Sequence, residues 1–555
     1  EPDGRDDQER LPHHQIICKE TETRSSVRAM AFNIADLFEH VADRVPDRTA
    51  IIIGDERLTY GELDRRATQV AHRFAALGLG PGDHVGIYAY NGMPWVEAML
   101  GAFKLRAVPI NINFRYVEDE LLYLLDNADC RIVVYDPEFA TRLEAVQPRI
   151  PVVEHALPID ETWAIERDAQ SPDRDFDERS PDDHYMLYTG GTTGMPKGVV
   201  WRQEDVFMAL GQGIDALTGH KVESDTELAD QAKDGFPLVS FMLPPLMHGA
   251  CQWGMLGMFF KGNTVVLTPK FEAEEVWATV ERDKVNSVMI TGDAMGRPLI
   301  EALEATNGRY DTSSLLAVSS SAALFSAPVK DRFFEFFPNL MITDSIGSSE
   351  GGFNGIAQIG KDDTAMKGGP TVQPAPDTVV VDEDLNVLAP GSGVIGKVAR
   401  GGNIPIGYYK DEAKTKATFV HAPDGRRYVV AGDFAMWEAD GTITLLGRGS
   451  VCINSGGEKI FPEEVESALK SHPEVFDALV VGAADERWGQ RVAAVVQPRP
   501  GLSPSLEDLM AHCRTKIAGY KVPRELHLVD AIVRSPSGKP DYPWAVKLVE
   551  AAAAR

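Results

Sequence analysis

The residues best suited to chemistry form the segment TGGTTGMPKG, which runs from Thr189 to Gly198 after the short apolar stretch HYMLY. Glycine permits the backbone angles that turn amide N–H groups inward onto an anion, and threonine hydroxyls add further donors. Lys197 adds a positive charge to the same loop. The segment therefore predicts a phosphate-binding loop that follows a strand, rather than a plain turn between two strands.

Two widespread phosphate loops are excluded by the order of residues around Lys197. A Walker A loop requires Gly-Lys-Ser/Thr, whereas here the lysine stands between Pro196 and Gly198. A dinucleotide-binding fold requires a G-x-G-x-x-G that opens a helix, with an acidic residue at a fixed distance, and the segment lacks this pattern.

Three later segments carry further candidate groups: IGSSEGG (346–352), AGDFAMWEADGTITLLGR (431–448) and SPSGKPDY (535–542). The groups that could do chemistry in them are the carboxylates of Glu350 and Asp433 and the ammonium group of Lys539.

Taken in this order, the four motifs resemble the signatures of the adenylate-forming superfamily, which includes acyl-CoA synthetases, peptide-synthetase adenylation domains and beetle luciferases. The resemblance covers the chain after its first ~30 residues. It implies ATP, Mg²⁺ and coenzyme A as cofactor and co-substrates. It implies that Glu350 and Thr189 hold the metal, that Lys539 is the catalytic lysine, and that the nucleotide is bound by Thr189, Gly190, Gly191, Thr192, Thr193, Gly194, Lys197, Ser349, Asp433 and Arg448.

Further segments gain a role only through this resemblance. INSGGEKIFPEEVE (453–466) is similar to the loop that guides the pantetheine arm of coenzyme A, which points to Ser455, Gly456 and Gly457. SSSAAL (319–324) stands where relatives line the adenine and acyl sites, which makes Ser321 a candidate. His248 in LPPLMHGA stands where relatives keep an aromatic residue or a histidine beside the substrate carboxylate, although a histidine in an apolar segment can equally be structural.

The sequence departs from the family pattern at two positions. Ile346 replaces the tyrosine that stacks on adenine, so an apolar contact takes the place of stacking. Gly449-Ser450 stands where the family has an acidic or lysine hinge residue, so Ser450 is only a provisional pivot.

The implied reaction has two halves: ATP-dependent formation of an acyl adenylate with release of pyrophosphate, then transfer of the acyl group to coenzyme A. The wording of the motifs is closest to actinobacterial fatty or steroid side-chain acyl-CoA synthetases, and a fatty, aromatic or steroid side-chain acid is expected. Met-, Phe- and Trp-rich segments at 207–217 and 247–258 are candidates for an apolar acyl pocket. The alternatives are loading of a carrier protein in trans, a luciferase-like oxygenase and a catalytically idle binding protein.

The elements that must position these residues follow an α/β pattern. Short β-rich runs alternate with amphipathic helical segments, which predicts a parallel sheet flanked by helices. After Gly369 the pattern changes to Gly- and Val-rich strands, which predicts a small β-subdomain. We expect a disordered leader (1–29), with Met30 as a candidate native start, a large ATP- and acyl-binding domain (30–449), and a small, mobile C-terminal α+β lid domain (450–555).

Bulk composition narrows the choice of partners. The 555 residues carry a formal net charge of −28, which disfavours nucleic acid as a partner. Five dispersed cysteines without a CxxC pair suit neither a disulfide framework nor a zinc site, and favour a reducing cytoplasm. The uncharged stretch 241–260 is broken by prolines and glycines, so we interpret it as buried loop and helix rather than a transmembrane segment. The oligomeric state stays open, with a homodimer as one candidate.

Overall fold

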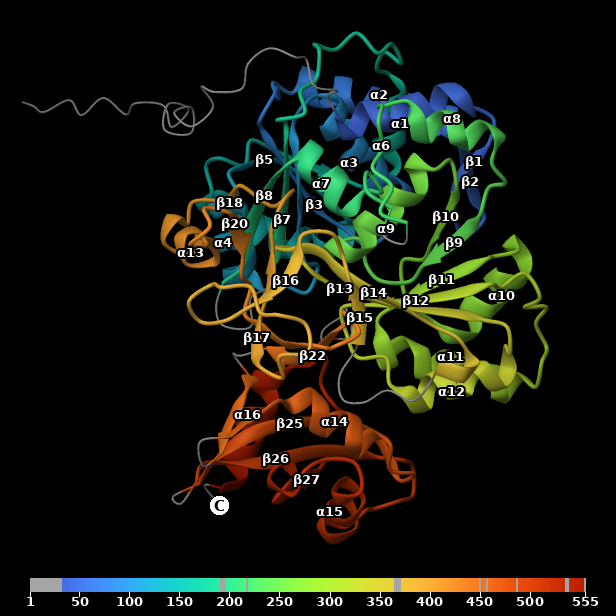
Figure 1. Cartoon of the computed structure of the whole chain (residues 1–555). Coiled ribbons are helices and arrows are strands. Elements are labelled where there is room, and N and C mark those ends of the chain that lie inside the picture. The colour runs from blue at the N-terminus through green and yellow to red at the C-terminus, as the bar shows by residue number, and fades with distance from the viewer. Residues whose placement is uncertain are drawn as a thin grey trace, which may run out of the picture.

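A computed structural model describes residues 32–189, 195–215, 218–363, 371–448, 451–455, 458–485, 488–534 and 539–553. The expected leader, 1–29, and Met30 lie outside the described residues. Figure 1 shows a large body that carries most of the chain and, below it in orange to red, a smaller unit built from the C-terminal residues.

The first part of the chain folds around a parallel sheet of four strands in the order β4-β3-β5-β6. Helices cover both faces, because α2 and α3 pack in one apolar cluster and α4 and α5 in another. The start of α2 is encoded locally: Thr59 and Glu62 form a reciprocal capping box. The elements are α1 (Ile34–Arg44), β1 (Thr49–Ile53), β2 (Glu56–Thr59), α2 (Tyr60–Ala76), β3 (His84–Tyr88), α3 (Met93–Lys104), β4 (Val108–Asn111), α4 (Glu118–Asn127), β5 (Cys130–Tyr135), α5 (Ala140–Val146), β6 (His155–Pro158) and α6 (Glu161–Asp168).

A second, larger sheet contains a parallel core in the order β13-β12-β11-β9-β10-β1. Helices α10 to α12 pack on one face, and α9 packs with α1 to α3 in the cluster on the other. The predicted parallel sheet flanked by helices is confirmed. The elements are α7 (Gln203–Leu210), α8 (Glu227–Asp234), β9 (Val239–Met242), α9 (Gly249–Phe260), β10 (Thr264–Leu267), α10 (Ala273–Asp283), β11 (Ser287–Ile290), α11 (Gly292–Thr306), β12 (Ala317–Ser321), α12 (Ala327–Phe336) and β13 (Met341–Ser348).

The same sheet continues into antiparallel strands, as expected for the β-subdomain after Gly369. Its elements are β14 (Gly352–Ile359), β15 (Thr371–Pro374), β16 (Thr378–Val381), β17 (Ile395–Arg400), β19 (Phe419–His421), β20 (Arg427–Val429), β21 (Asp433–Trp437) and β22 (Ile443–Arg448). A separate three-stranded sheet, β18-β8-β7, consists of β7 (His184–Thr189), β8 (Lys197–Arg202) and β18 (Gly407–Tyr408), and α13 (Glu412–Thr418) follows it.

The C-terminal unit has its own five-stranded sheet and its own apolar clusters. Helix α14 begins at Pro462, where a proline and two glutamates in the first turn favour a helix start. The elements are β23 (Ile453–Ser455), β24 (Glu458–Ile460), α14 (Pro462–Lys470), β25 (Val475–Asp485), β26 (Gly489–Pro498), α15 (Leu506–Arg514), β27 (Glu525–Leu528) and α16 (Tyr542–Ala553).

Two segments singled out in the sequence lie largely within regular elements. The stretch 241–260 folds as the end of β9, a short loop and α9, which confirms the interpretation as buried loop and helix. The segment 346–352 lies mostly in the β13–β14 hairpin, because both of its ends pair across the two strands. None of the described helices is long and apolar enough to cross a membrane.

Candidate functional site

The predicted phosphate loop joins two paired strands. Thr189 ends β7 and Lys197 begins β8, and the two residues stand directly opposite each other in the antiparallel register. Gly198 is required at its position, because a Cβ atom there would come within 2.7 Å of the Met186 sulfur and the Tyr188 ring. Gly190, Gly191, Thr192, Thr193 and Gly194 lie outside the described residues, so their contacts with phosphate stay a prediction.

Lys197 forms an ion pair with Asp411, the residue that caps α13. The carboxylate of Asp411 also accepts a hydrogen bond of 2.9 Å from the backbone N–H of Lys414. These two contacts, the lysine first, lower the pKa of Asp411 below its usual value. The lysine of the loop is therefore held by a carboxylate that is itself fixed at a helix start.

Glu350 lies on the turn between β13 and β14, together with Ser349. The Ser348 hydroxyl accepts a hydrogen bond of 2.8 Å from the Gly351 N–H within this turn. The Trp201 indole of β8 donates a hydrogen bond of 3.0 Å to the Ser349 carbonyl oxygen. The turn that carries Glu350 is thereby attached to the same strand that begins with Lys197.

The Glu350 carboxylate accepts a hydrogen bond of 3.0 Å from the Tyr408 hydroxyl of β18. Because β18 pairs with β8, this contact brings the predicted metal ligand to the three-stranded sheet that frames the phosphate loop. The structure thus gathers Thr189, Lys197 and Glu350 around one small sheet. Trp201, Tyr408 and Asp411 lie outside the predicted motifs, and no spacing signal marks them: Tyr408 is 58 residues from its partner. Ser348 lies within the 346–352 motif but was not singled out there.

The candidate nucleotide residues outside this sheet lie on neighbouring strands. Asp433 begins β21 and Arg448 ends β22, and the two stand opposite each other in the antiparallel register. Ser321 ends β12 and lies beside Ser345 of β13, one residue before Ile346. Ile346 is half-buried against the apolar cluster of the β-subdomain, so it also has a packing role.

His248 precedes α9 as its N-cap residue. Its Nε2 atom is buried and, among the residues that the structure describes, has no hydrogen-bond partner. Burial, and then the positive charges of Lys539 and Arg115, lower the pKa of His248 to about 3. The imidazole is therefore neutral at ordinary pH, and Lys539 of the C-terminal unit lies within electrostatic range of it.

Acid should destabilise the wild-type protein through His248. Its pKa in the folded state is below the value of an exposed histidine, so the unfolded chain binds the additional proton and stability falls as pH drops from about 6.5 towards 3. Chemical denaturation at pH 7 and pH 5 should show that His248→Gln loses about 1–2 kcal/mol less than wild type over this interval. An identical loss in both proteins would contradict the neutral state of His248.

Lys539 is exposed, and its chain position is fixed on both sides. Arg534 and Pro540 form an antiparallel bridge around it, and the Arg534 guanidinium pairs with Asp477 at 2.7 Å.

Ser455 of β23 pairs with Gly489 and Glu458 in the sheet of the C-terminal unit. Gly456, Gly457 and Ser450 lie outside the described residues, so the pantetheine contact and the hinge stay predictions.

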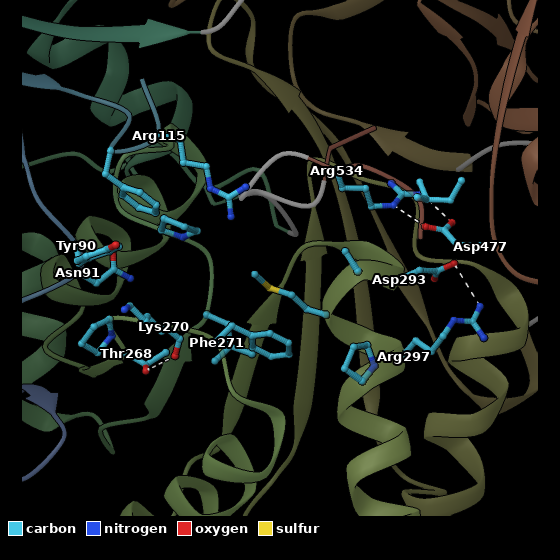
Figure 2. Close-up of a pocket in the computed structure, with 18 of the residues that line it drawn as sticks. Tyr90, Asn91, Arg115, Thr268, Lys270, Phe271, Asp293, Arg297, Asp477 and Arg534 are labelled. Atoms are coloured by element: carbon cyan, nitrogen blue, oxygen red, sulfur yellow. Dashed lines mark hydrogen bonds and ion pairs between the residues drawn. The ribbon is translucent and has the colours of Figure 1, made fainter. Parts of the chain in front are cut away.

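A cavity of about 780 Å³ opens between the large body and the C-terminal unit. Figure 2 shows Tyr90, Arg115 and Lys270 on one side of it and the Asp477–Arg534 pair on the other. The wall on the side of the large body is built from residues that follow β3, β4, β5, β9, β10 and β11. It therefore lies at the carboxyl ends of both parallel sheets. Such ends are where open α/β sheets bind ligands.

The wall of the large body is aromatic and positively charged, in contrast to the chain as a whole. Tyr90, Phe114 and Phe139 form a ring cluster with centroids 4.7 to 6.1 Å apart. Arg115, Arg142 and Lys270 line the cavity beside it. With Arg297 of α11, the large body contributes four cations to the lining, against the two carboxylates of Glu138 and Asp293. Neither of the segments expected to form the acyl pocket, 207–217 and 247–258, lines this cavity, and Phe207 and Met255 are buried in the core instead.

Known protein families and relatives match this chain over most of its length. Residues 38–409 match the family described as AMP-binding enzyme, and residues 464–539 match the AMP-binding enzyme C-terminal domain. A 3-oxocholest-4-en-26-oate–CoA ligase of Rhodococcus rhodochrous is 51% identical over 532 residues, which cover 93% of this chain and 96% of that protein. A medium/long-chain-fatty-acid–CoA/3-oxocholest-4-en-26-oate–CoA ligase of Mycobacterium marinum is 52% identical, over 94% of this chain and 98% of that one.

Solved structures share the fold at low identity. The anthranilate CoA ligase AuaEII in complex with anthranoyl-AMP matches with a TM-score of 0.82 and 23% identity, over 95% of this chain and 99% of that one. A Mycobacterium tuberculosis fatty acyl CoA synthetase matches with a TM-score of 0.71 and 23% identity, over 94% of this chain and 99% of that one. These matches confirm the fold class, a large α/β domain followed by a smaller C-terminal domain.

Proposed function

The chain belongs to the AMP-binding enzyme family and is an AMP-forming acid–thiol ligase, and we propose that it activates a fatty or steroid side-chain carboxylic acid as an acyl adenylate before transfer to coenzyme A. The observation that carries the proposal is the convergence of Lys197, Thr189 and Glu350 on the sheet β18-β8-β7, with Lys539 within electrostatic range of His248. Loading of a carrier protein is not favoured, since the whole-chain relatives are named CoA ligases.

In the adenylation half of the reaction, a carboxylate oxygen attacks the α-phosphorus of ATP, and the bond to the departing pyrophosphate breaks. Magnesium, when bound, neutralises phosphate charge and orients the leaving group. Glu350 and Thr189 would hold it; a single carboxylate suffices where phosphate oxygens complete the set. Lys197 would bind the outer phosphates, and Lys539 would stabilise the negative charge that develops between the two reactants.

In the second half, the thiol of coenzyme A attacks the acyl carbonyl carbon and AMP leaves with the electrons of the broken C–O bond. Lys539 must then give way to the thiol. The proposal therefore includes a lid, residues 450–555, that rotates about Ser450 between the two steps. His248, neutral at ordinary pH, is suited to donate or accept a hydrogen bond beside the acyl carboxylate.

The acid is proposed to be large and apolar. Support comes from relatives that are about half identical over nearly their whole length and whose names specify medium- or long-chain fatty acids and a steroid side-chain acid. The described residues of 207–217 and 247–258 contribute to the same apolar cluster. Phe207 also packs against Phe260, two residues beyond the second segment, with ring centroids 5.6 Å apart. The half-buried members of the two segments, including Leu210, Ile214 and Met258, are the candidates for contact with an acyl group.

The test is a direct assay of the two products. Purified protein is incubated with MgATP, a panel of short, long, aromatic and steroid side-chain acids, and either coenzyme A or a phosphopantetheinylated carrier protein, while AMP and thioester are measured. Acyl-CoA should form with the long-chain or steroid acids. Absence of acyl-CoA with every acid would overturn the ligase assignment, and thioester on the carrier alone would favour the alternative acceptor.

The interdomain cavity is the proposed location of the nucleotide part of coenzyme A. Four cations and two carboxylates on the large-body wall create a local positive field that suits its phosphates, and the aromatic cluster suits its adenine. Pro245, which lines the cavity, lies three residues before His248, and Arg115 lies close enough to lower the pKa of His248. The cavity thus leads towards the residue proposed to meet the acyl group.

Removing two of these charges should weaken the binding of coenzyme A without affecting adenylation. For Arg115→Gln/Lys270→Gln we expect KM for coenzyme A to rise about tenfold, as for the loss of one or two charge-assisted contacts, with ATP–pyrophosphate exchange unchanged. Pantetheine, which lacks the nucleotide, is the matched acceptor and should keep its KM. Arg149→Gln, at an exposed site outside the cavity, is the control variant. An unchanged KM for coenzyme A would exclude this location.

A further inference from the structure

Four consecutive residues, Tyr408 to Asp411, contact the phosphate site without belonging to any of the motifs that identify it. We call them the 408–411 segment. It begins on β18, where Tyr408 pairs with Val199 of β8, and ends at the N-cap of α13. Tyr408 reaches Glu350 and Asp411 reaches Lys197, so one short segment contacts both the proposed metal ligand and the lysine of the phosphate loop.

The two middle residues of the segment fix it to the large body. The Tyr409 hydroxyl donates a hydrogen bond of 2.7 Å to the Asp129 carboxylate, and the Lys410 ammonium pairs with the same carboxylate at 2.7 Å. The Tyr409 N–H also donates to the Gly198 carbonyl oxygen at 2.8 Å, which ties the segment to the strand that begins with Lys197. Residues 409 and 410 therefore act as anchors.

The backbone of the segment is held in an uncommon conformation. Lys410 has φ of +53°, in the left-handed region that L-residues rarely adopt. The Tyr408 N–H donates a hydrogen bond of 2.8 Å to the Thr415 hydroxyl of α13, which holds the start of the segment against the helix that follows. Such conformations cost free energy and persist where surrounding contacts impose them. The segment is thus a rigid support rather than a loose connection.

The contact between Tyr408 and Glu350 determines how the carboxylate presents its oxygens. The hydroxyl donates to Oε1 at 3.0 Å, and among the described residues it is the hydrogen-bond donor that reaches the Glu350 side chain. A hydrogen bond of this kind fixes the rotamer of a carboxylate and leaves its remaining lone pairs for a metal ion or a water ligand. Replacing a residue that orients a metal ligand in this way commonly changes the affinity of the site for the metal ion.

The contact between Asp411 and Lys197 has a different consequence. One carboxylate oxygen serves the helix cap and the other pairs with the ammonium group, so the lysine is held at a fixed place before nucleotide arrives. A triphosphate must share the lysine with Asp411 when it binds. The ion pair therefore orients the lysine and at the same time reduces its attraction for phosphate.

We propose that the 408–411 segment positions the phosphate-site groups, with Tyr408 orienting Glu350 for the metal and Asp411 orienting Lys197 for the triphosphate. This inference rests on the proposed function, because it assigns a role within the adenylation step. Tyr408 and Asp411 act through Glu350 and Lys197, so both are positioning residues rather than catalytic ones.

The first test is Tyr408→Phe, which removes one hydroxyl and keeps the ring. The Mg²⁺ concentration that half-saturates ATP–pyrophosphate exchange should rise about tenfold, as for other residues that orient a metal ligand. Tyr310→Phe is the matched control, because the Tyr310 hydroxyl also donates to a glutamate at 3.0 Å but on an exposed surface. An unchanged Mg²⁺ requirement in Tyr408→Phe would overturn the role of Tyr408, even if the rate were lower.

The second test is Asp411→Asn, which removes the charge and keeps a side chain able to cap α13. Freed from its ion pair, Lys197 should attract ATP more strongly but be less well oriented, so KM for ATP should fall roughly threefold while kcat falls about tenfold. Asp160→Asn, at the N-cap of α6, is the control for loss of a capping carboxylate. A merely structural role for Asp411 would leave KM for ATP unchanged or raised, which would contradict the proposal.

Failure of the inference and failure of the proposed function give different results. Wild-type protein that forms no acyl adenylate from any acid would refute the function itself. Wild-type exchange that requires Mg²⁺, together with variants that keep the wild-type Mg²⁺ requirement and KM for ATP, would refute only the positioning role of the 408–411 segment.

Discussion

Replacing Lys539 by alanine should abolish adenylation and leave thioester formation largely intact. We expect ATP–pyrophosphate exchange to fall about a hundredfold to a thousandfold, the usual effect of removing a group that stabilises transition-state charge. Conversion of supplied acyl adenylate to acyl-CoA should fall less than about threefold, because the proposed lid has then moved the lysine away. The measurement is exchange of labelled pyrophosphate, followed by acyl-CoA formation from synthetic acyl adenylate.

The structure supports a role of Lys539 in the first of these two steps. Lys539 lies within electrostatic range of His248, beside the place proposed for the acyl carboxylate, although it belongs to the C-terminal unit. Lys547 on α16 is an exposed lysine of the same unit, and Lys547→Ala should behave as wild type in both assays. Equal loss of both half-reactions in Lys539→Ala would contradict the role assigned to the lysine.

Much of the fold could be predicted because the determining signals are local. Pro462 followed by two glutamates marks the start of α14. The short apolar run of β10 is followed by the amphipathic pattern of α10. Helix α11 was not predicted, since Gly292, Gly296 and Pro298 weaken its local helix signal. Its buried side chains pack with α10 and α12, so tertiary contacts stabilise a helix that propensity disfavours.

The candidate site was only partly predictable for a related reason. Glu350 and Lys197 stand in glycine- and hydroxyl-rich segments that carry a chemical signature of their own. Tyr408 and Asp411 stand in an ordinary strand end and helix start, and only the pairing of β18 with β8 brings them to the phosphate site. Contacts between residues 58 or 214 positions apart are set by the fold and leave no local pattern.

The net charge of the chain is also an incomplete guide to its ligands. The net charge of −28 excludes a general attraction for anions, and it would argue against a triphosphate and coenzyme A as ligands if it were uniform. The large-body wall of the cavity reverses this sign locally, because Arg115, Arg142, Lys270 and Arg297 outnumber Glu138 and Asp293 there. These cations lie in segments that follow four different strands, which the two parallel sheets bring together. Composition therefore constrains macromolecular partners better than it constrains small ligands.

Replacing Glu350 by glutamine should produce the clearest dependence on metal. Glutamine keeps an oxygen that can accept the hydrogen bond from the Tyr408 hydroxyl, so the β13–β14 turn should be preserved. The negative charge that would bind magnesium is lost. We expect ATP–pyrophosphate exchange to fall about a hundredfold at ordinary Mg²⁺ and the half-saturating Mg²⁺ concentration to rise more than tenfold. Glu274→Gln removes the same charge from the exposed Tyr310 pair and should leave both values unchanged. A Glu350→Gln enzyme with the wild-type Mg²⁺ requirement would mean that another group holds the metal and that the Tyr408 contact serves the turn alone.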